Sequence, residues 1–296
     1  MGKGEAMEFL TLTKILELLQ SKNINMKKYL GQHFLIDRNS RDKLLSFAEI
    51  KKSDIVIEIG PGMGALTDGV IDKVKKIYAF EIDPDFCGIL KERFSEYPNF
   101  HLLKKDFLET EKRWWEELPG KVKVIGNTPY YISLPIVFQI LKMRNKIELA
   151  LLTVQKEVGE RLTASPGSKH YGAVSVLLSI YSQAKICYLL RRDVFFPKPE
   201  VSSVAVRIVP LEKPVVNIEN EKAFWEFLPR IFNLRRKKLS NVAHKIFGIE
   251  KEGFKHLLEE EKISPDVRVE NLSPEEIYRV FKAITILKKS AVISPV

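Results

Sequence analysis

One segment constrains the fold more than any other: residues 56–64 read VIEIGPGMG. An apolar run leads into glycines at positions 60, 62 and 64, and glycine permits backbone conformations and close approaches that a Cβ atom would block. A strand can therefore turn sharply into a helix beneath a ligand. We predict a parallel α/β sheet that binds a nucleotide-like ligand at this turn.

The pattern on either side of this segment supports that fold class. Apolar runs alternate with helical periodicity up to Pro210, and the later residues 220–286 show helical patterns without a strand signal. We therefore expect a Rossmann-like α/β domain at 1–211 and a smaller all-α domain at 212–296. The expected strands are 54–60, 76–83, 101–106, 122–127, 147–155 and a closing antiparallel pair at 185–190 and 201–210. The expected helices before the second domain are 8–21, 37–50, 64–75, 84–95 and 171–182.

Two acids stand where the second and third strands end. Glu81 follows the first glycine by about 20 residues, a separation at which a carboxylate reaches ribose hydroxyls. Asp106 ends the third strand, where an acid can accept a hydrogen bond from an adenine amine. The glycine spacing alone leaves NAD open, because the sixth position of the dinucleotide fingerprint sometimes carries alanine, as Ala65 does here.

A second motif, GNTPYY at 126–131, follows the fourth expected strand. Adenine N6 is a poor nucleophile because its lone pair is delocalised into the ring. The side-chain carbonyl of Asn127 and the backbone carbonyl of Thr128, held rigid by Pro129, can accept the N6 hydrogens and favour a pyramidal nitrogen. Tyr130 offers an aromatic face to an unstacked base. Together the two motifs predict methyl transfer from S-adenosylmethionine to adenine N6, driven by alignment and electrostatics.

The composition indicates a polyanionic partner. The chain has 296 residues and a formal net charge of +10, and its densest basic run is Arg235, Arg236, Lys237 and Lys238, which we expect to contact phosphates. No apolar run approaches the roughly 18 residues of a membrane span, and the first residues lack a signal-peptide pattern. We expect a cytoplasmic protein that does not contact membranes. Cys87 and Cys187 have no metal-ligand spacing, so we expect buried, reduced thiols and no metal.

At this point the chain resembles the KsgA family of ribosomal RNA adenine dimethyltransferases over nearly its full length. The segments that carry the resemblance are KKYLGQHFLID (27–37), VIEIGPGMGALT (56–67), FEIDPD (80–85), KKDFL (104–108), GNTPYYIS (126–133), QKEVGERLTASPGSKHYGAVSV (155–176), FFPKPEVSSVAVRI (195–208), LRRKKLSNVA (234–243) and VRVENLSPEE (267–276). The resemblance implies dimethylation of N6 on two adjacent adenosines in a hairpin near the 3′ end of small-subunit rRNA. The implied partner is a small-subunit assembly intermediate, bound by a monomer.

The resemblance also implies roles for individual residues. The implied cofactor contacts are His33, Leu35, Gly60, Gly62, Glu81, Asp106 and Asn127. Asn127 through Tyr130 would form the target-base pocket, and Phe195 would be a second stacking surface. The basic run 235–238 would hold rRNA by phosphate and shape rather than by base reading. The chain departs from the family at His33, where the family has Asn, and at Thr128, where it has Leu.

Three other functions remain open on the sequence. An Erm-type enzyme would share the fold and the catalytic tetrad but modify one adenosine of large-subunit rRNA. The ASPGSKHYG and RRKKL segments favour the KsgA family over an Erm-type enzyme. A non-catalytic ribosome-assembly factor could retain the cofactor fold, although the intact glycines, acids and tetrad argue against it. An NAD-dependent oxidoreductase would share the glycine turn, but no histidine or carboxylate positioned for hydride chemistry is visible.

Overall fold

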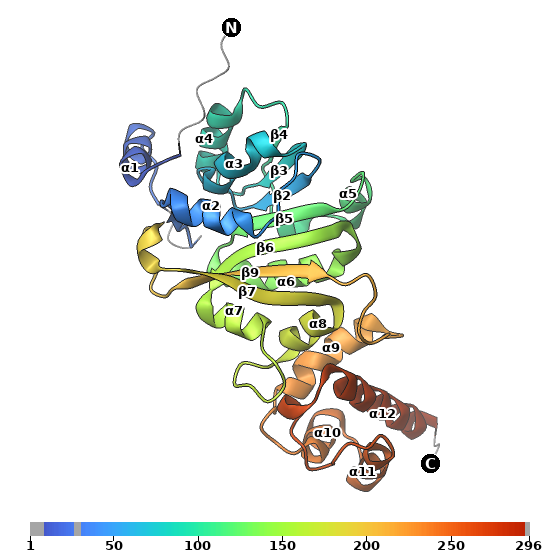
Figure 1. Cartoon of the computed structure of the whole chain (residues 1–296). Helices are drawn as coiled ribbons and strands as arrows, with labels where there is room; N and C mark the ends of the chain where they lie inside the picture. Colours follow the sequence, from blue (N-terminus) through green and yellow to red (C-terminus); the bar gives the residue numbers. More distant parts are fainter. Residues whose placement is uncertain (1–8, 27–30, 294–296) are drawn as a thin grey trace. The chain divides into compact units, whose positions relative to one another are not determined.

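The computed structural model of the protein describes residues 9–26 and 31–293, with the side chains of 9–26 and 31–288 (Figure 1). The contacts divide the chain into two compact units. The first comprises Met1–Gly159 and Gln183–Pro210, and the second comprises Glu160–Ser182 and Leu211–Val296. The last boundary between the two units lies after Pro210, where the sequence pattern changes. Residues 160–182 group with the C-terminal helices instead of the α/β unit that precedes them in the chain.

The first unit is built on a seven-stranded sheet with the strand order β4-β3-β2-β5-β6-β9-β7. Its five neighbouring strands from β4 to β6 pair in parallel, so that Ile57 of central β2 lies between Tyr78 and Val124. Every residue of β2 is buried, as expected for a strand covered on both faces. The Rossmann-like fold class is confirmed. The strands are β2 (Ile55–Ile59), β3 (Lys76–Phe80), β4 (Phe100–Leu103), β5 (Val122–Asn127), β6 (Ile147–Gln155), β7 (Ser182–Leu190) and β9 (Ser203–Pro210).

Two features close this unit. β9 pairs antiparallel with β6, where Leu152 lies opposite Val206, and β7 is the other neighbour of β9. A separate two-stranded ribbon joins β1 (Phe34–Leu35) to β8 (Phe195–Phe196) in antiparallel register. The sequence pattern did not indicate this ribbon, because strands of two residues are too short to show a period.

Local sequence explains where the helices of this unit begin. The Asp37 side chain accepts a hydrogen bond from the Ser40 N–H and caps α2, while Asp83 caps α4 ahead of Pro84. Gly64 is the residue that precedes α3; its φ is +88°, and a Cβ atom there would lie 2.6 Å from the Phe94 ring. The helices are α1 (Leu12–Ser21), α2 (Arg38–Ser46), α3 (Ala65–Val70), α4 (Pro84–Phe94), α5 (Lys112–Glu116) and α6 (Ser133–Lys142). A further helix, α7 (Lys156–Leu162), contains the boundary between the two units at Gly159 and Glu160.

The second unit is helical. Its core gathers aromatic side chains: the Phe224 ring packs edge-on against Tyr278 and Phe281 at centroid distances of 5.7 and 5.4 Å. The predicted helical character after Pro210 is thus confirmed. The helices are α8 (Ala173–Tyr181), α9 (Glu221–Phe232), α10 (Leu239–Phe247), α11 (Lys251–Glu260) and α12 (Pro274–Ile293).

Candidate active site

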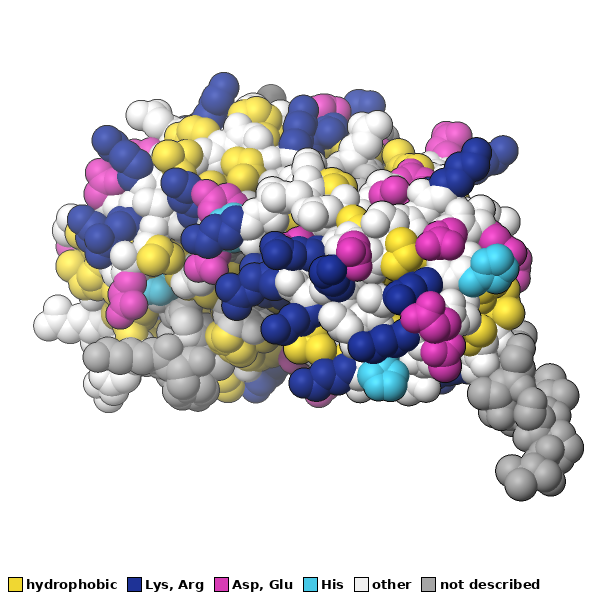
Figure 2. Space-filling model, turned by 90° about the horizontal axis from the view of Figure 1, so that it is seen from below, with side chains coloured by type: hydrophobic (Ala, Val, Ile, Leu, Met, Phe, Trp, Pro, Cys, Tyr) yellow, Lys and Arg dark blue, Asp and Glu magenta, His cyan; other side chains and the backbone are white. Residues whose placement is uncertain are grey.

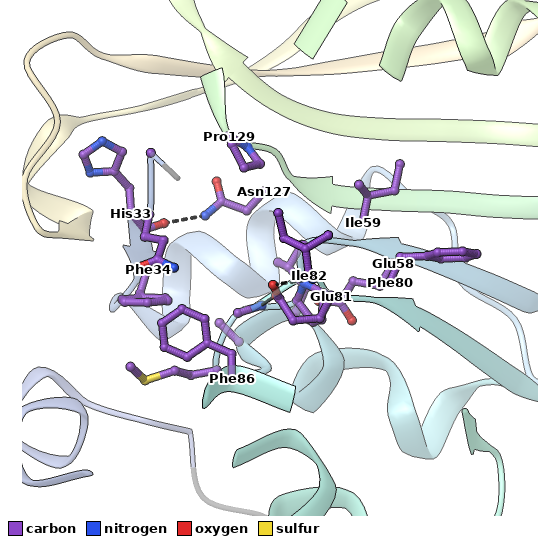
Figure 3. Close-up of a pocket in the computed structure, with 18 of the residues that line it drawn as sticks. His33, Phe34, Glu58, Ile59, Phe80, Glu81, Ile82, Phe86, Asn127 and Pro129 are labelled. Carbon is purple, nitrogen blue, oxygen red and sulfur yellow. Dashed lines mark hydrogen bonds between the residues drawn. The ribbon is translucent and has the colours of Figure 1, made fainter. Parts of the chain in front are cut away.

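A pocket in the first unit lies at the carboxyl ends of β2, β3 and β5, the edge where open α/β sheets bind their ligands (Figure 3). Side chains from β1 and from the loop before it form part of the same wall. The pocket brings together all the residues predicted to contact the cofactor: His33, Leu35, Gly60, Gly62, Glu81, Asp106 and Asn127. Of the predicted segment 27–37, residues 27–30 lie outside the described part of the chain.

The glycine turn forms the floor of this pocket. Gly60 and Gly62 have φ values of +65° and +58°, which residues with a Cβ atom rarely adopt. A Cβ atom on Gly62 would lie 3.0 Å from the Phe34 ring, which comes from β1. The Gly60 N–H donates to the Phe80 carbonyl at 3.0 Å and ties the turn to β3. The result is a cradle of bare backbone that a ligand can approach closely.

Glu81 ends β3 as a buried carboxylate held by backbone amides. Its Oε2 accepts from the Gly62 N–H at 3.0 Å, and its Oε1 accepts from the N–H groups of Ile82 and Asp83, both at 2.9 Å. Burial raises the pKa of Glu81, while these hydrogen bonds oppose the rise. A carboxylate offers about four acceptor sites, so Oε2 can still accept from a ligand hydroxyl. This geometry suits a ribose.

Asp106 and Asn127 complete the polar wall. Asp106 Oδ1 accepts from the Leu108 N–H at 2.8 Å, which fixes the side chain beside the pocket. Asn127 Nδ2 donates to the His33 carbonyl at 2.7 Å (Figure 3). Because a backbone carbonyl can only accept, this bond assigns the amide orientation and leaves Asn127 Oδ1 as an acceptor. The residues present therefore fit S-adenosylmethionine and, beside it, an amine that accepts the methyl group.

The next three residues of the tetrad differ in exposure. Thr128 is 2% exposed, and its hydroxyl points into the sheet, where it donates to the Thr153 carbonyl. Pro129 lines the pocket. The Tyr130 hydroxyl shares a 2.8 Å hydrogen bond with Ser203 Oγ, and its ring stacks on His33 at a centroid distance of 5.4 Å. Stacking of a target base on Tyr130 stays a prediction, because His33 covers part of that ring here.

Phe195 lies in the core. It is 3% exposed, pairs with Leu35 across the β1–β8 ribbon, and packs in the same cluster as Val56 and Ile125. Its ring has no open face for a base in this conformation. The sequence placed Phe195 at the target base, and that role would require the ribbon to open; it stays a prediction.

The sequence analysis passed over Glu58, which lines the same pocket. It is 1% exposed; its Oε2 accepts from the Thr67 hydroxyl at 2.6 Å, and its Oε1 has no partner among the described residues. Desolvation raises the pKa of Glu58 from 4.5 to about 8. A signal was present, since Glu58 is the one charged residue inside the apolar run VIEI.

This burial makes stability depend on pH. A folded-state pKa above the unfolded value means that the folded state holds the extra proton, so the free energy of unfolding should fall as pH rises from about 4.5 to about 8. Glu58→Gln should flatten that fall, as measured by urea unfolding across the range. The pKa values of Asp68 and Glu81 are also raised, so the test compares variant with wild type at each pH. Parallel pH profiles would contradict the assignment to Glu58.

The four basic residues 235–238 belong to the second unit and are not equivalent. Arg235 Nη1 donates to the carbonyls of Lys169 and Tyr171 at 2.9 and 3.1 Å, and its Nε lies 3.7 Å from Glu270. Lys238 forms an exposed ion pair with Asp266 at 3.0 Å. Arg236 and Lys237 are exposed. Figure 2 shows Lys and Arg side chains gathered near the centre of one face of the molecule.

Two predicted absences concern metals and membranes. No cluster of three or more potential metal ligands occurs in the described part of the chain. Within residues 9–26 and 31–293, no helix is both long and apolar enough to cross a membrane. Cys87 and Cys187 are both free; Cys87 is buried as predicted, whereas Cys187 is half-buried.

Comparisons with known proteins show the family to which the chain belongs. The family model described as "Ribosomal RNA adenine dimethylase" matches residues 23–285. The chain belongs to this family. Two relatives are each named "Ribosomal RNA small subunit methyltransferase A". The Clostridium botulinum protein is 36% identical and the match covers 90% of this chain and 97% of the relative. The Lactococcus lactis protein is 37% identical, with 92% and 95% covered.

Two solved structures have a fold similar to that of this chain. A dimethyladenosine transferase from Plasmodium falciparum superposes with a TM-score of 0.70 at 24% identity, covering 85% of this chain and 97% of its own. The 23S rRNA methyltransferase ErmE superposes with a TM-score of 0.65 at 23% identity, covering 85% and 99%. At these identities the likeness shows the fold. Membership of the ribosomal RNA adenine dimethylase family confirms the resemblance found in the sequence.

Proposed function

We propose that the protein transfers methyl groups from S-adenosylmethionine to N6 of two adjacent adenosines in the 3′-terminal hairpin of small-subunit rRNA. The observation that carries this proposal is the orientation of the Asn127 amide. Its nitrogen is committed to the His33 carbonyl, so its oxygen is the group left to accept a hydrogen bond from an amine at the cofactor pocket. The names of the relatives support the small subunit as the source of the substrate.

In this mechanism the chain aligns the reactants. When bound, the cofactor would supply an electrophilic methyl group, and the electron pair of the broken methyl–sulfur bond would stay on sulfur in the leaving thioether. Glu81 and Asp106 would hold its ribose and adenine, and the glycine turn would let it lie close to β2. In the first transfer Asn127 Oδ1 and the Thr128 carbonyl would accept the two N6 hydrogens, and in the second transfer Asn127 Oδ1 would accept the one that remains. Both arrangements favour a pyramidal nitrogen with its lone pair free. The N6 proton stays hydrogen-bonded at Asn127 Oδ1 during transfer and leaves to solvent afterwards, so no general base is needed.

The decisive experiment supplies labelled S-adenosylmethionine together with unmodified small subunits and, in a parallel reaction, unmodified large-subunit RNA, and maps the modified positions on both ribosomal RNAs. We expect dimethyladenosine at two adjacent sites near the 3′ end of the small-subunit RNA. Label confined to large-subunit RNA would indicate an Erm-type enzyme. Cofactor binding without any label would indicate a binding factor on a methyltransferase scaffold.

We further propose that the enzyme acts as a monomer in the cytoplasm on a small-subunit assembly intermediate. The net charge of +10 supports an RNA partner. Light scattering of the protein alone would test whether it is a monomer, and co-sedimentation with assembly intermediates would test the proposed partner.

Within the basic run, we propose that Arg236 and Lys237 contact phosphates and that Arg235 holds residues 169–171 in place. The double variant Arg236→Ala with Lys237→Ala should make the negative slope of log binding constant against log salt concentration shallower by about 2. It should leave the melting temperature unchanged. Arg235→Ala should lower the melting temperature by a few degrees, because Arg235 donates to two backbone carbonyls. RNA binding measured between low and high salt, with thermal unfolding of each variant, separates the roles. An unchanged slope in the double variant would place the RNA elsewhere.

A further inference from the structure

Thr128, one of the two departures from the family pattern, has a buried hydroxyl with defined partners. Its Oγ1 donates to the Thr153 carbonyl at 3.0 Å and lies 3.4 Å from Ser133 Oγ. In the parallel pairing of β5 with β6, Asn127 is the last residue of β5 and lies opposite Thr153. Thr128 is therefore the first residue beyond the pair, and its side chain extends the hydrogen bonding between the strands by one further link.

The other side of the same peptide is also held. The Pro129 carbonyl accepts from the Ile132 N–H at 3.2 Å and from Ser133 Oγ at 3.3 Å. Pro129 itself has a φ fixed by its ring at −54°. The peptide carbonyl of residue 128 thus lies between two anchored points, the Thr128 side chain and the Pro129 carbonyl.

The methyl group of Thr128 fixes which way its hydroxyl points. A Cβ atom on Gly126 would lie 3.1 Å from Thr128 Cγ2 and 3.0 Å from the Ile59 carbonyl, so a glycine at 126 makes room for this methyl group. With the methyl group seated there and the residue 2% exposed, the hydroxyl is directed to Thr153. A leucine, the residue that the family has here, could fill space but could not donate to that carbonyl.

We propose that the Thr128 hydroxyl is a positioning group for methyl transfer: its hydrogen bond to the Thr153 carbonyl sets the direction of the Thr128 carbonyl, the second acceptor for the target amine. This inference rests on the proposed function. The Thr128 carbonyl matters most when N6 becomes pyramidal. A misdirected carbonyl should therefore destabilise the transition state more than it destabilises the bound substrate.

The test compares isosteric variants. Thr128→Val keeps the shape and removes the hydroxyl, and we expect kcat to fall about tenfold while KM for RNA and cofactor stays within about twofold of wild type. Thr128→Ser keeps the hydroxyl without the methyl group that directs it, and should recover part of kcat. A purely structural role would lower the melting temperature in proportion to activity and would not give this separation of kcat from KM.

Thr285→Val is the matched control. The Thr285 hydroxyl also donates to a backbone carbonyl, that of Phe281 at 2.8 Å, and Thr285 does not line the pocket. This variant should keep the wild-type kcat. If Thr128→Val does not fold, Ser133→Ala removes the neighbouring hydroxyl and should lower kcat by a smaller factor.

The outcomes separate the inference from the function on which it rests. Wild-type kcat in Thr128→Val, or an equal loss in Thr128→Ser, would overturn the positioning role while leaving the methyltransferase intact. A wild-type protein that binds cofactor but transfers no methyl group would overturn the proposed function and the positioning role together.

Discussion

Replacing Asn127 by alanine should lower the kcat for methyl transfer at least about 10³-fold, the upper end of the loss seen when one preorganised polar group is removed from an active site. The amide is held by its Nδ2 bond to the His33 carbonyl, so its oxygen is oriented before substrate arrives. RNA affinity should change little, because the proposed phosphate contacts belong to the second unit. Single-turnover methylation of unmodified small subunits and a filter-binding assay would measure the two effects.

Asn99→Ala is the matched control for that variant. Asn99 Nδ2 also donates to backbone carbonyls, those of Ile71 at 2.8 Å and Val74 at 3.2 Å, and Asn99 does not line the pocket. The two variants should lose comparable stability, of order 1 kcal/mol. Comparable losses of kcat in both would show that Asn127 acts through folding, and wild-type rates in Asn127→Ala would refute the mechanism.

Replacing Glu81 by alanine should weaken S-adenosylmethionine binding about 10²-fold. The variant removes the acceptor for the N–H groups of Gly62, Ile82 and Asp83 as well as the proposed ribose contact. Hydrogen bonds to charged groups contribute roughly 1.5–3 kcal/mol each, and the loss of one such bond to the ligand accounts for this change in affinity. Isothermal titration calorimetry with the cofactor would measure it.

Glu250→Ala controls for the loss of a carboxylate that accepts from backbone amides. Glu250 accepts from the N–H groups of Glu252 and Gly253 at 2.8 and 2.7 Å where α11 begins. It should lower stability without changing cofactor affinity. Cofactor affinity in Glu81→Ala within about threefold of wild type would show that this carboxylate supports the turn without binding the ligand.

Much of the α/β unit could be predicted because buried parallel strands leave a strong signal. β5 and β6 have the predicted bounds, and β2 and β3 begin at or next to the predicted residue. The cofactor residues could be placed together since strand ends and a glycine turn must meet at one edge of the sheet. What the sequence could not give are contacts between distant residues that leave no period, such as Tyr130 with Ser203 or Arg235 with the 169–171 carbonyls.

Burial was the other information that the sequence lacked. Phe195 and Phe196 are identical in type and adjacent, yet Phe195 lies in the core and Phe196 is half-buried. Which of two neighbouring rings faces the core depends on the register of the β1–β8 ribbon, and that register is set by pairing with Phe34 and Leu35.

The bond between Asn127 and residue 33 bears on which substitutions position 33 can accept. The group that orients the Asn127 amide is the main-chain carbonyl of residue 33, and a main-chain carbonyl is present whichever amino acid stands there. Substitution at this position, such as histidine for the usual asparagine, therefore leaves the orienting bond available. The orientation of the Asn127 amide therefore depends on the path of the main chain at residue 33 more than on the side chain that residue 33 carries.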